Sequence, residues 1–211
     1  MKTDDLIGLL ATGAGPVEPP RDGRLMLIGL PVAFVVAVVA VTLSMGLVPP
    51  ALWGASSTAT KLAYAGLVAG AGIWLLRCAG RPGMSVAGPL ILLAALLGVV
   101  AATGVMDLLM AQPEARMSRL IGYSSITCPW AVMVLSLPAL AATMAAVRLL
   151  APVRLRLAGA AAGLAAGGVA AGAYALGCTE GAYVFIAAWY SLGLALATGL
   201  GALIGPQVLR W

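Results

Sequence analysis

The sequence predicts an all-α integral membrane protein, a bundle of six transmembrane helices. Hydrophobic residues make up 62% of its 211 residues, charged residues make up 9%, and the mean hydropathy is +1.06. These values lie far outside the range of soluble domains. Since a helix needs about 20 apolar residues to cross the hydrocarbon core, a chain of this length can hold roughly five to seven spans with short loops.

Six apolar runs, separated by polar or turn-forming residues, predict the individual helices. The first run follows Arg24 and ends before Pro49, and the second run ends at Gly80, Arg81 and Pro82. Pro138 lies in the middle of the fourth run, where we expect it to kink the helix. The predicted helices cover residues 25–47, 61–78, 86–110, 128–148, 155–177 and 181–208. They form a transmembrane domain, 25–211, after a polar segment, 1–24.

The distribution of basic residues predicts the orientation in the membrane. With both termini in the cytoplasm, the cytoplasmic side holds Lys2, Arg21, Arg24, Arg77, Arg81, Arg148, Arg154, Arg156 and Arg210, and the outer side holds Lys61, Arg116 and Arg119. This asymmetry follows the positive-inside rule, so we expect both termini to be cytoplasmic. The net charge of +5 is then explained by orientation, and no nucleic-acid partner is expected.

The polar segment 1–24 contains a short predicted helix. Asp4 and Asp5 suit its first turn, and Leu6, Leu9 and Leu10 recur at helical spacing. Two or three turns are too few for a stable helix in water. The segment therefore either lies on the membrane by its apolar face or folds when it docks in the groove of a partner.

Two cysteines are predicted to meet at the outer side. Cys128 begins the fourth helix, where Pro129 at the first helical position makes Cys128 the N-cap, and Cys178 lies in the turn before the sixth helix. In an oxidising compartment they can form a structural disulfide, or they can react with oxidants and soft metals. Two unrelated small residues are the third interpretation. Cys78 falls at the opposite side and is expected to be a packing residue.

The remaining residues narrow the chemistry. Histidine is absent, so a metal would have to be held by thiols and carboxylates, with Cys128 and Cys178 as the candidate ligands. No nucleotide-binding loop or hydrolase motif occurs, so we expect neither an enzyme nor a resident cofactor. Asp107 is the one carboxylate predicted inside a span, and Arg116 or Arg119 can pair with it. Asp107 and Glu180 are kept as accessory neighbours of the thiols.

Small residues at every fourth position mark the last two helices. They are Gly159, Gly163 and Gly167 in one helix and Gly193, Ala197, Gly201 and Gly205 in the other. Such faces let two helix backbones approach closely. We expect them to pack these two helices within one chain, with a homodimer interface as the alternative.

Several of these stretches resemble one known family. They are Met-Lys-Thr-Asp-Asp-Leu-Ile-Gly-Leu-Leu at the start, the Cys128 segment, Tyr-Ala-Leu-Gly-Cys at 174–178, Trp-Tyr-Ser-Leu-Gly at 189–193, and Leu-Ile-Gly-Pro-Gln-Val-Leu-Arg-Trp at the end. The chain is similar over nearly its whole length to the NrsF family. Its members are six-span anti-sigma factors of the bacterial inner membrane, which negatively regulate an extracytoplasmic-function sigma factor.

The resemblance implies a function for both ends of the molecule. The cytoplasmic segment would hold a sigma factor at the membrane through Asp4, Asp5, Leu6, Ile7, Leu9 and Leu10, and the periplasmic pair Cys128 and Cys178 would report metal or oxidant stress. A heavy-metal ion would bind there only transiently. The competing interpretations are a small transporter or metal-efflux component with Asp107 and the thiols along its path, and an assembly protein that uses its glycine faces.

Overall fold

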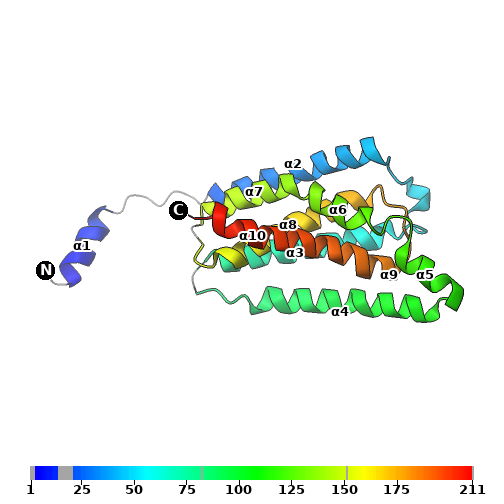
Figure 1. Ribbon diagram of the computed structural model, residues 1–211. Coiled ribbons are helices and arrows are strands. Elements are labelled where there is room, and N and C mark those ends of the chain that lie inside the picture. The colour runs from blue at the N-terminus through cyan, green and yellow to red at the C-terminus, as the bar shows by residue number, and fades with distance from the viewer. Residues whose placement is uncertain (1–2, 14–20, 82, 151, 211) are drawn as a thin grey trace.

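In the computed structural model, which describes residues 3–13, 21–81, 83–150 and 152–210, every regular element of the described chain is a helix (Figure 1). In chain order these are α1 (Thr3–Gly13), α2 (Arg21–Ser44), η1 (Pro50–Leu52), α3 (Thr58–Ala79), α4 (Ala87–Met110), α5 (Pro113–Ile121), α6 (Thr127–Leu135), α7 (Leu137–Arg148), α8 (Leu155–Ala175), α9 (Tyr183–Phe185), η2 (Ile186–Tyr190) and α10 (Ser191–Val208). The element η1 is a 3₁₀ turn and η2 is a π-helical turn. The predicted all-α fold is confirmed.

The described helices form five spans, or six if one bent pair is counted as a span, that are long and apolar enough to cross a membrane. Five unbroken stretches qualify in the described chain: Gly23–Ser44, Thr58–Ala79, Ala87–Met110, Leu155–Ala175 and Tyr183–Val208. The pair α6 and α7 adds a sixth, bent by 40° at Ser136. Pro138 explains the bend, since it lacks the N–H that would bond the carbonyl of Val134. The direction in which the bundle crosses the membrane stays a prediction.

Helix α8 forms the centre of the bundle. It packs against α10, α3, α7, α2 and α6, and its buried residues are almost all alanine or glycine. A Cβ atom on Gly159 would collide with the carbonyl oxygen of Gly201, and one on Gly163 would collide with that of Ala197. The two small-residue faces therefore meet within one chain, as expected. Gly193 differs, because it faces Pro129 and Val132 of α6.

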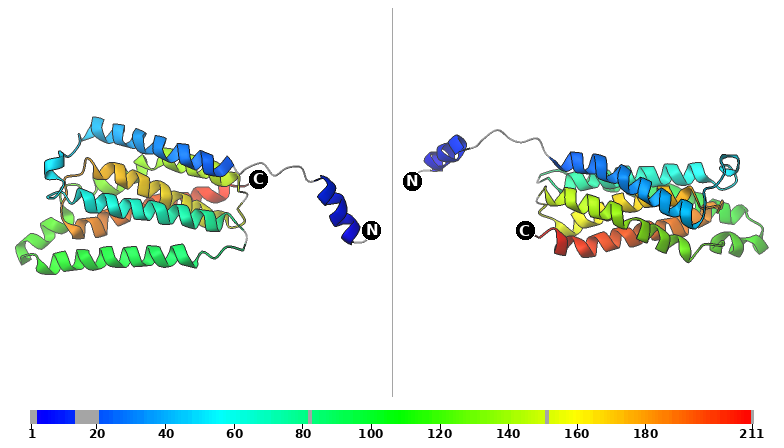
Figure 2. Two further views of the ribbon diagram at one scale, coloured as in Figure 1. Left: turned by 180° about the vertical axis from the view of Figure 1, so that it is seen from behind. Right: turned by 90° about the horizontal axis from the view of Figure 1, so that it is seen from above.

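Helix α4 lies at the edge of the bundle, as the view from behind shows (Figure 2, left). It packs along α3 and, near its end, against α9 and η2. All residues of α4 are described, and of these only Pro89 and Gly104 are buried. Most of its apolar surface is thus left for contact with lipid.

The helix boundaries differ from the predicted ones at several places. Helix α2 starts at Arg21, before the predicted boundary, and α3 starts three residues before Lys61, at Thr58. The connection 111–123 contains α5, for which Pro113 supplies the first helical residue and Glu114 a favourable first-turn charge. A search for apolar runs does not detect this short helix, because it is amphipathic and contains charged residues.

The prediction that Cys128 is an N-cap is wrong. Helix α6 begins at Thr127 with Ile126 as its N-cap, and the N–H of Cys128 donates a hydrogen bond to the carbonyl of Ser124 at 2.8 Å. Helical hydrogen bonding thus starts before Pro129. Cys128 still lies in the first turn of the helix.

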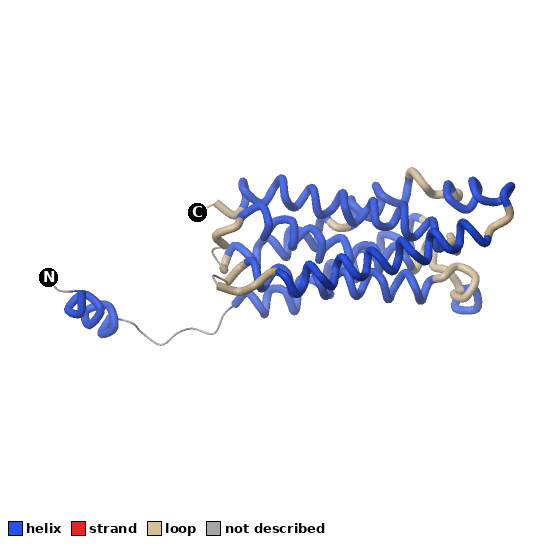
Figure 3. The backbone as a smooth tube through the Cα atoms, turned by 90° about the horizontal axis from the view of Figure 1, so that it is seen from below, coloured by secondary structure: helices blue, strands red, loops and turns tan. Residues whose placement is uncertain are grey.

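The bundle has two distinct ends (Figures 1 and 3). The terminal face is the end where α2 begins, α10 ends, and the loops α3–α4 and α7–α8 turn. The cysteine face is the opposite end, formed by residues 48–57, 111–127 and 176–182. Helix α1 stands away from the bundle on the side of the terminal face. Residues 1, 2 and 14–20 of the predicted N-terminal segment lie outside the described chain.

Candidate functional site

Cys128 and Cys178 lie in one buried cluster near the cysteine face. Both are free thiols, with 0% and 2% of their surface exposed, and both belong to the same hydrophobic cluster. They are within electrostatic range of each other and of Lys61 and Glu180. The structure thus brings together two thiols that are fifty positions apart in the sequence. Their burial means that a reagent can reach them only after the cysteine face opens.

Lys61 is the buried charged residue beside this cluster. The predicted span 61–78 begins at Lys61, on the outer side, whereas α3 begins at Thr58 and places Lys61 one turn inside the helix with no exposed surface. Its Nζ donates a hydrogen bond to the carbonyl of Cys178 at 2.7 Å and lies 5.9 Å from the ring centroid of Tyr190. The ammonium therefore satisfies a carbonyl in the turn that follows α8, three residues after the helix ends, and makes a cation–π contact with Tyr190.

The signal for Lys61 was present in the sequence. Ser56, Ser57 and Thr58 are typical of a helix start, and a start there places Lys61 inside the span. An ionisable side chain inside a span is a functional candidate with a partner to be found. Among the described residues that partner is a backbone carbonyl and an aromatic face, and no carboxylate forms an ion pair with it.

Three tyrosines, Tyr64, Tyr174 and Tyr190, belong to the same buried cluster as the thiols. The rings of Tyr174 and Tyr190 are 5.9 Å apart at an interplanar angle of 54°, and Tyr64 shares a hydrogen bond of 2.9 Å with Ser191. Among the described residues, the buried hydroxyls of Tyr174 and Tyr190 have no partner in regular hydrogen-bond geometry, although Tyr174 faces Ser124 and Tyr190 faces Cys178. Buried hydroxyls of this kind usually have partners, so their presence beside the thiols distinguishes this cluster from ordinary packing.

The π-helical turn η2 places Tyr190 in the cluster. Within this turn the helix widens, and such turns occur frequently at functional sites. The neighbouring Trp189 packs against the same cluster, and its Nε1 donates a hydrogen bond to the carbonyl of Leu120 at 2.7 Å. The same turn thus contacts the thiol cluster and the end of α5.

The turn that carries Cys178 is fixed by bonds to the loop between α2 and α3. The N–H of Val48 donates to the carbonyl of Leu176 at 2.8 Å, and the hydroxyl of Ser57 donates to the carbonyl of Gly181 at 2.7 Å. Ser57 adopts a left-handed conformation with φ of 51°. Together with Lys61, these bonds tie the cysteine turn to the start of α3.

The two accessory carboxylates have defined partners. Glu180 accepts a hydrogen bond of 2.6 Å from the backbone N–H of Tyr123, beside the left-handed Gly122. Asp107 pairs with Arg119 and accepts a hydrogen bond of 3.2 Å from the N–H of Val184, at the start of α9. The pairing with Arg119 agrees with the prediction. Glu180 remains near the thiols, whereas Asp107 ties α4 to α5 and α9.

A metal at this site would depend on the thiols alone. In the described part of the chain no three side chains of His, Cys, Asp or Glu gather as a metal site. Two sulfur atoms suit a soft metal ion, or they can be joined by oxidation. The accessory roles of Asp107 and Glu180 in such chemistry stay predictions.

The predicted partner-binding residues lie far from this cluster, in α1. Asp4, Asp5, Leu6, Ile7 and Leu10 are exposed, with Leu6, Ile7 and Leu10 showing 44%, 59% and 67% of their surface. The side chain of Leu9 lies outside the described part. Exposed apolar side chains on a short helix are available for a partner's groove or for the membrane surface. Cys78 lies at the terminal face, apart from the thiol pair, as expected.

Fold and site together define a multi-span helical membrane protein with a buried thiol pair near one end and an exposed amphipathic segment beyond the other. A profile of the family described as "Negative regulator of sigma F", NrsF, matches residues 10–211. Two curated relatives are 36% identical to this chain over the full length of both proteins: the probable anti-sigma-F factor NrsF of Azospira oryzae and the anti-sigma-F factor NrsF of Caulobacter vibrioides. No solved structure matches. The chain belongs to the NrsF family, and its relatives are regulators and not enzymes, as the sequence predicted.

Proposed function

We propose that this chain is a transmembrane anti-sigma factor that holds an extracytoplasmic-function sigma factor at the bacterial inner membrane. The observation that carries this proposal is the full-length similarity to two anti-sigma-F factors. The exposed apolar residues of α1 supply a contact of peptide size for the sigma factor. The basic residues favour a cytoplasmic position for both termini, where a sigma factor is available.

Deletion of residues 2–20 is expected to abolish retention of the sigma factor. The deletion removes all exposed apolar residues of α1 and leaves the bundle, whose contacts begin at α2. The measurement is co-purification of the cognate sigma factor with the full-length protein and with the shortened form. A double change of Leu6→Ser and Leu10→Ser should act in the same direction, with Ala11→Ser as the control. Equal retention by the shortened protein would contradict the assignment of the binding segment.

We further propose that Cys128 and Cys178 report stress at the cysteine face. An oxidant that removes two electrons and two protons from the thiols would join them as a disulfide, and a soft metal ion would bind both sulfurs. Either reaction acts between the first turn of α6 and the turn after α8, so it changes how these helices meet. The bent junction at Ser136 and Pro138 is the natural flexing point between α6 and the terminal face.

Replacement of both cysteines by serine is expected to remove the response and keep repression. Serine is close to cysteine in size, so the bundle should fold and still retain the sigma factor. The measurement is transcription from a sigma-dependent promoter before and after exposure to an oxidant or a soft metal, with Cys78→Ser as the matched control. To shift the ratio of the sigma-releasing to the sigma-retaining state of the bundle from 1:99 to 99:1, modification of the thiols must favour the releasing state by about 5.5 kcal/mol. Induction that persists in the double mutant would overturn the sensor proposal.

A transporter has less support from the site. Asp107 is engaged by Arg119 and by the N–H of Val184 near the cysteine face, so its carboxylate closes a structural contact between α4, α5 and α9. Transport pathways more often place ionisable groups near the bilayer midplane.

A further inference from the structure

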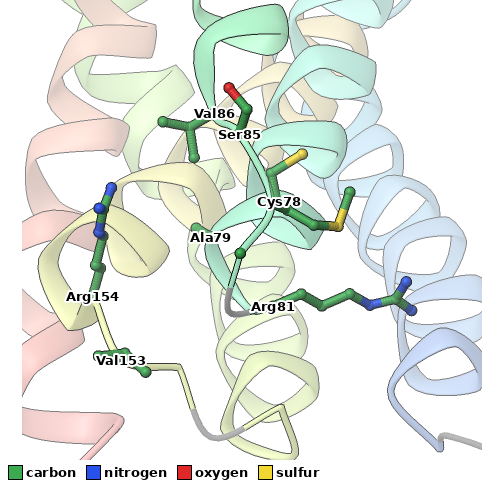
Figure 4. Close-up of a pocket in the computed structure, with 9 residues that line it drawn as sticks. Cys78, Ala79, Arg81, Ser85, Val86, Val153 and Arg154 are labelled. Carbon is green, nitrogen blue, oxygen red and sulfur yellow. The ribbon is translucent and has the colours of Figure 1, made fainter.

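A cavity of about 310 Å³ opens at the terminal face, where the end of α3, the start of α4 and the loop between α7 and α8 meet (Figure 4). Arg81 and Arg154 stand on two of its sides, Val86 and Val153 contribute apolar surface, and Cys78 and Ser85 complete the wall. None of the residues that line it is acidic. The cavity therefore offers positive charge next to apolar surface.

The two arginines are available to a ligand. Both are exposed, and in the described chain neither guanidinium takes part in a hydrogen bond or ion pair. They come from different loops and lie on opposite sides of the same opening. A guanidinium presents a planar fork of N–H donors that matches the oxygens of a phosphate, and two such forks can hold one phosphate group.

Backbone groups add to this positive potential. Helix α4 starts directly after Val86 and α8 directly after Arg154, and neither N-cap side chain bonds the first turn. Apart from the N–H of Ala87, which donates to Ser85, the first-turn N–H groups of these two helices have no side-chain cap, and both helices begin at residues that line the cavity. This contribution supports the arginines, which remain the principal binding groups.

The position of the cavity favours a lipid headgroup as its ligand. It lies at the ends of three candidate spans, α3, α4 and α8, which is the depth of lipid headgroups in a bilayer. Basic pockets between transmembrane helices at this depth bind anionic lipid headgroups, and the apolar wall can accompany the acyl chains. We propose that the Arg81–Arg154 cavity binds the phosphate headgroup of an anionic phospholipid.

The test uses the purified full-length protein and phosphatidylglycerol, with phosphatidylcholine as the neutral probe, and measures lipid binding by native mass spectrometry. The double change Arg81→Gln and Arg154→Gln is expected to weaken phosphatidylglycerol binding by at least about tenfold, the effect of one lost charge-assisted hydrogen bond. Binding of phosphatidylcholine should not change. The double change Arg24→Gln and Arg210→Gln removes the same charge from the same face and should alter binding less than about threefold.

Three results would overturn the proposal. Equal losses in both double mutants would show that diffuse positive charge, and not the cavity, attracts the lipid. Displacement of phosphatidylglycerol by millimolar inorganic phosphate would define a site for a free anion. Loss of sigma-factor retention with unchanged lipid binding in the Arg81 and Arg154 double mutant would assign the cavity to an acidic protein partner. The double change Arg81→Lys and Arg154→Lys keeps the charge. Its affinity for phosphatidylglycerol should lie between those of the unchanged protein and of the double glutamine variant.

Discussion

Substitution of Gly163 by leucine is expected to prevent stable formation of the bundle. A Cβ atom at this position would collide with the backbone carbonyl of Ala197, and backbone cannot rotate away as a side chain can. Each extra group forced into a packed interior destabilises a protein by about 1 to 3 kcal/mol, and leucine adds four carbons where there is no room for one. Because α8 packs against five other helices, its separation from α10 exposes buried residues of the central helix of the bundle.

Gly199 provides the matched control in α10. It lies two residues from Gly201, and a Cβ atom there would meet nothing within 4 Å. Gly199→Leu should therefore leave the stability nearly unchanged, or raise it slightly, since leucine favours a helix more than glycine does. The measurement is unfolding of both variants by sodium dodecyl sulfate in mixed micelles, followed by circular dichroism. Similar unfolding curves for the two variants would show that α8 and α10 do not pack through Gly163.

The sequence was informative about the spans because membrane crossing imposes a simple requirement. About 20 apolar residues per helix leave a strong pattern, and the small-residue spacing of α8 and α10 predicted their contact. Boundaries were less predictable where polar residues take part in helices. The predicted spans leave out residues 58–60 and the polar connection that contains α5, but both segments are helical in the structure.

The thiol pair could be predicted only as far as topology allowed. Counting spans places Cys128 and Cys178 at the same end of the bundle, but it does not give their burial or their neighbours. Tyr190 enters the cluster through a π-helical turn, and no residue pattern predicts such a turn. Lys61 enters because a long side chain on α3 reaches the carbonyl of Cys178 in the turn after α8, a contact over 117 positions.

The role of Lys61 connects the site to the stability of the whole chain. Its bond to Cys178 and the bond of Ser57 to Gly181 both join the start of α3 to the turn that carries the thiol. Helix α3 also packs closely on α8, where Gly72 and Gly168 leave no room for a Cβ atom. A change at Cys178 therefore acts on α3 and α8, which are packed too closely to shift independently. The end of α3 at the terminal face lines the Arg81–Arg154 cavity.

Reversal of the charge at Lys61 is expected to be among the most damaging single changes near the site. In Lys61→Glu a carboxylate would be buried against the carbonyl oxygen of Cys178 and the electron-rich face of Tyr190, with Glu180 nearby. Each of these neighbours repels a negative charge. An unpaired charge in such a position destabilises a protein by about 3 to 5 kcal/mol. We therefore expect Lys61→Glu to lose the folded state under conditions in which the unchanged protein is stable.

Lys61→Met separates the effect of charge from that of shape. Methionine has nearly the same length and leaves the carbonyl of Cys178 without its donor, which destabilises by about 1 to 3 kcal/mol, while removal of a buried ammonium offsets part of that loss. Stability measured by detergent unfolding should thus be highest for the unchanged protein, lower for Lys61→Met and lowest for Lys61→Glu. Arg116→Glu, on the partly exposed α5, tests a charge reversal outside the bundle core and should have a smaller effect. If Lys61→Glu proved as stable as Lys61→Met, the side chain at position 61 must reach water, and its contact with the thiol cluster would not hold.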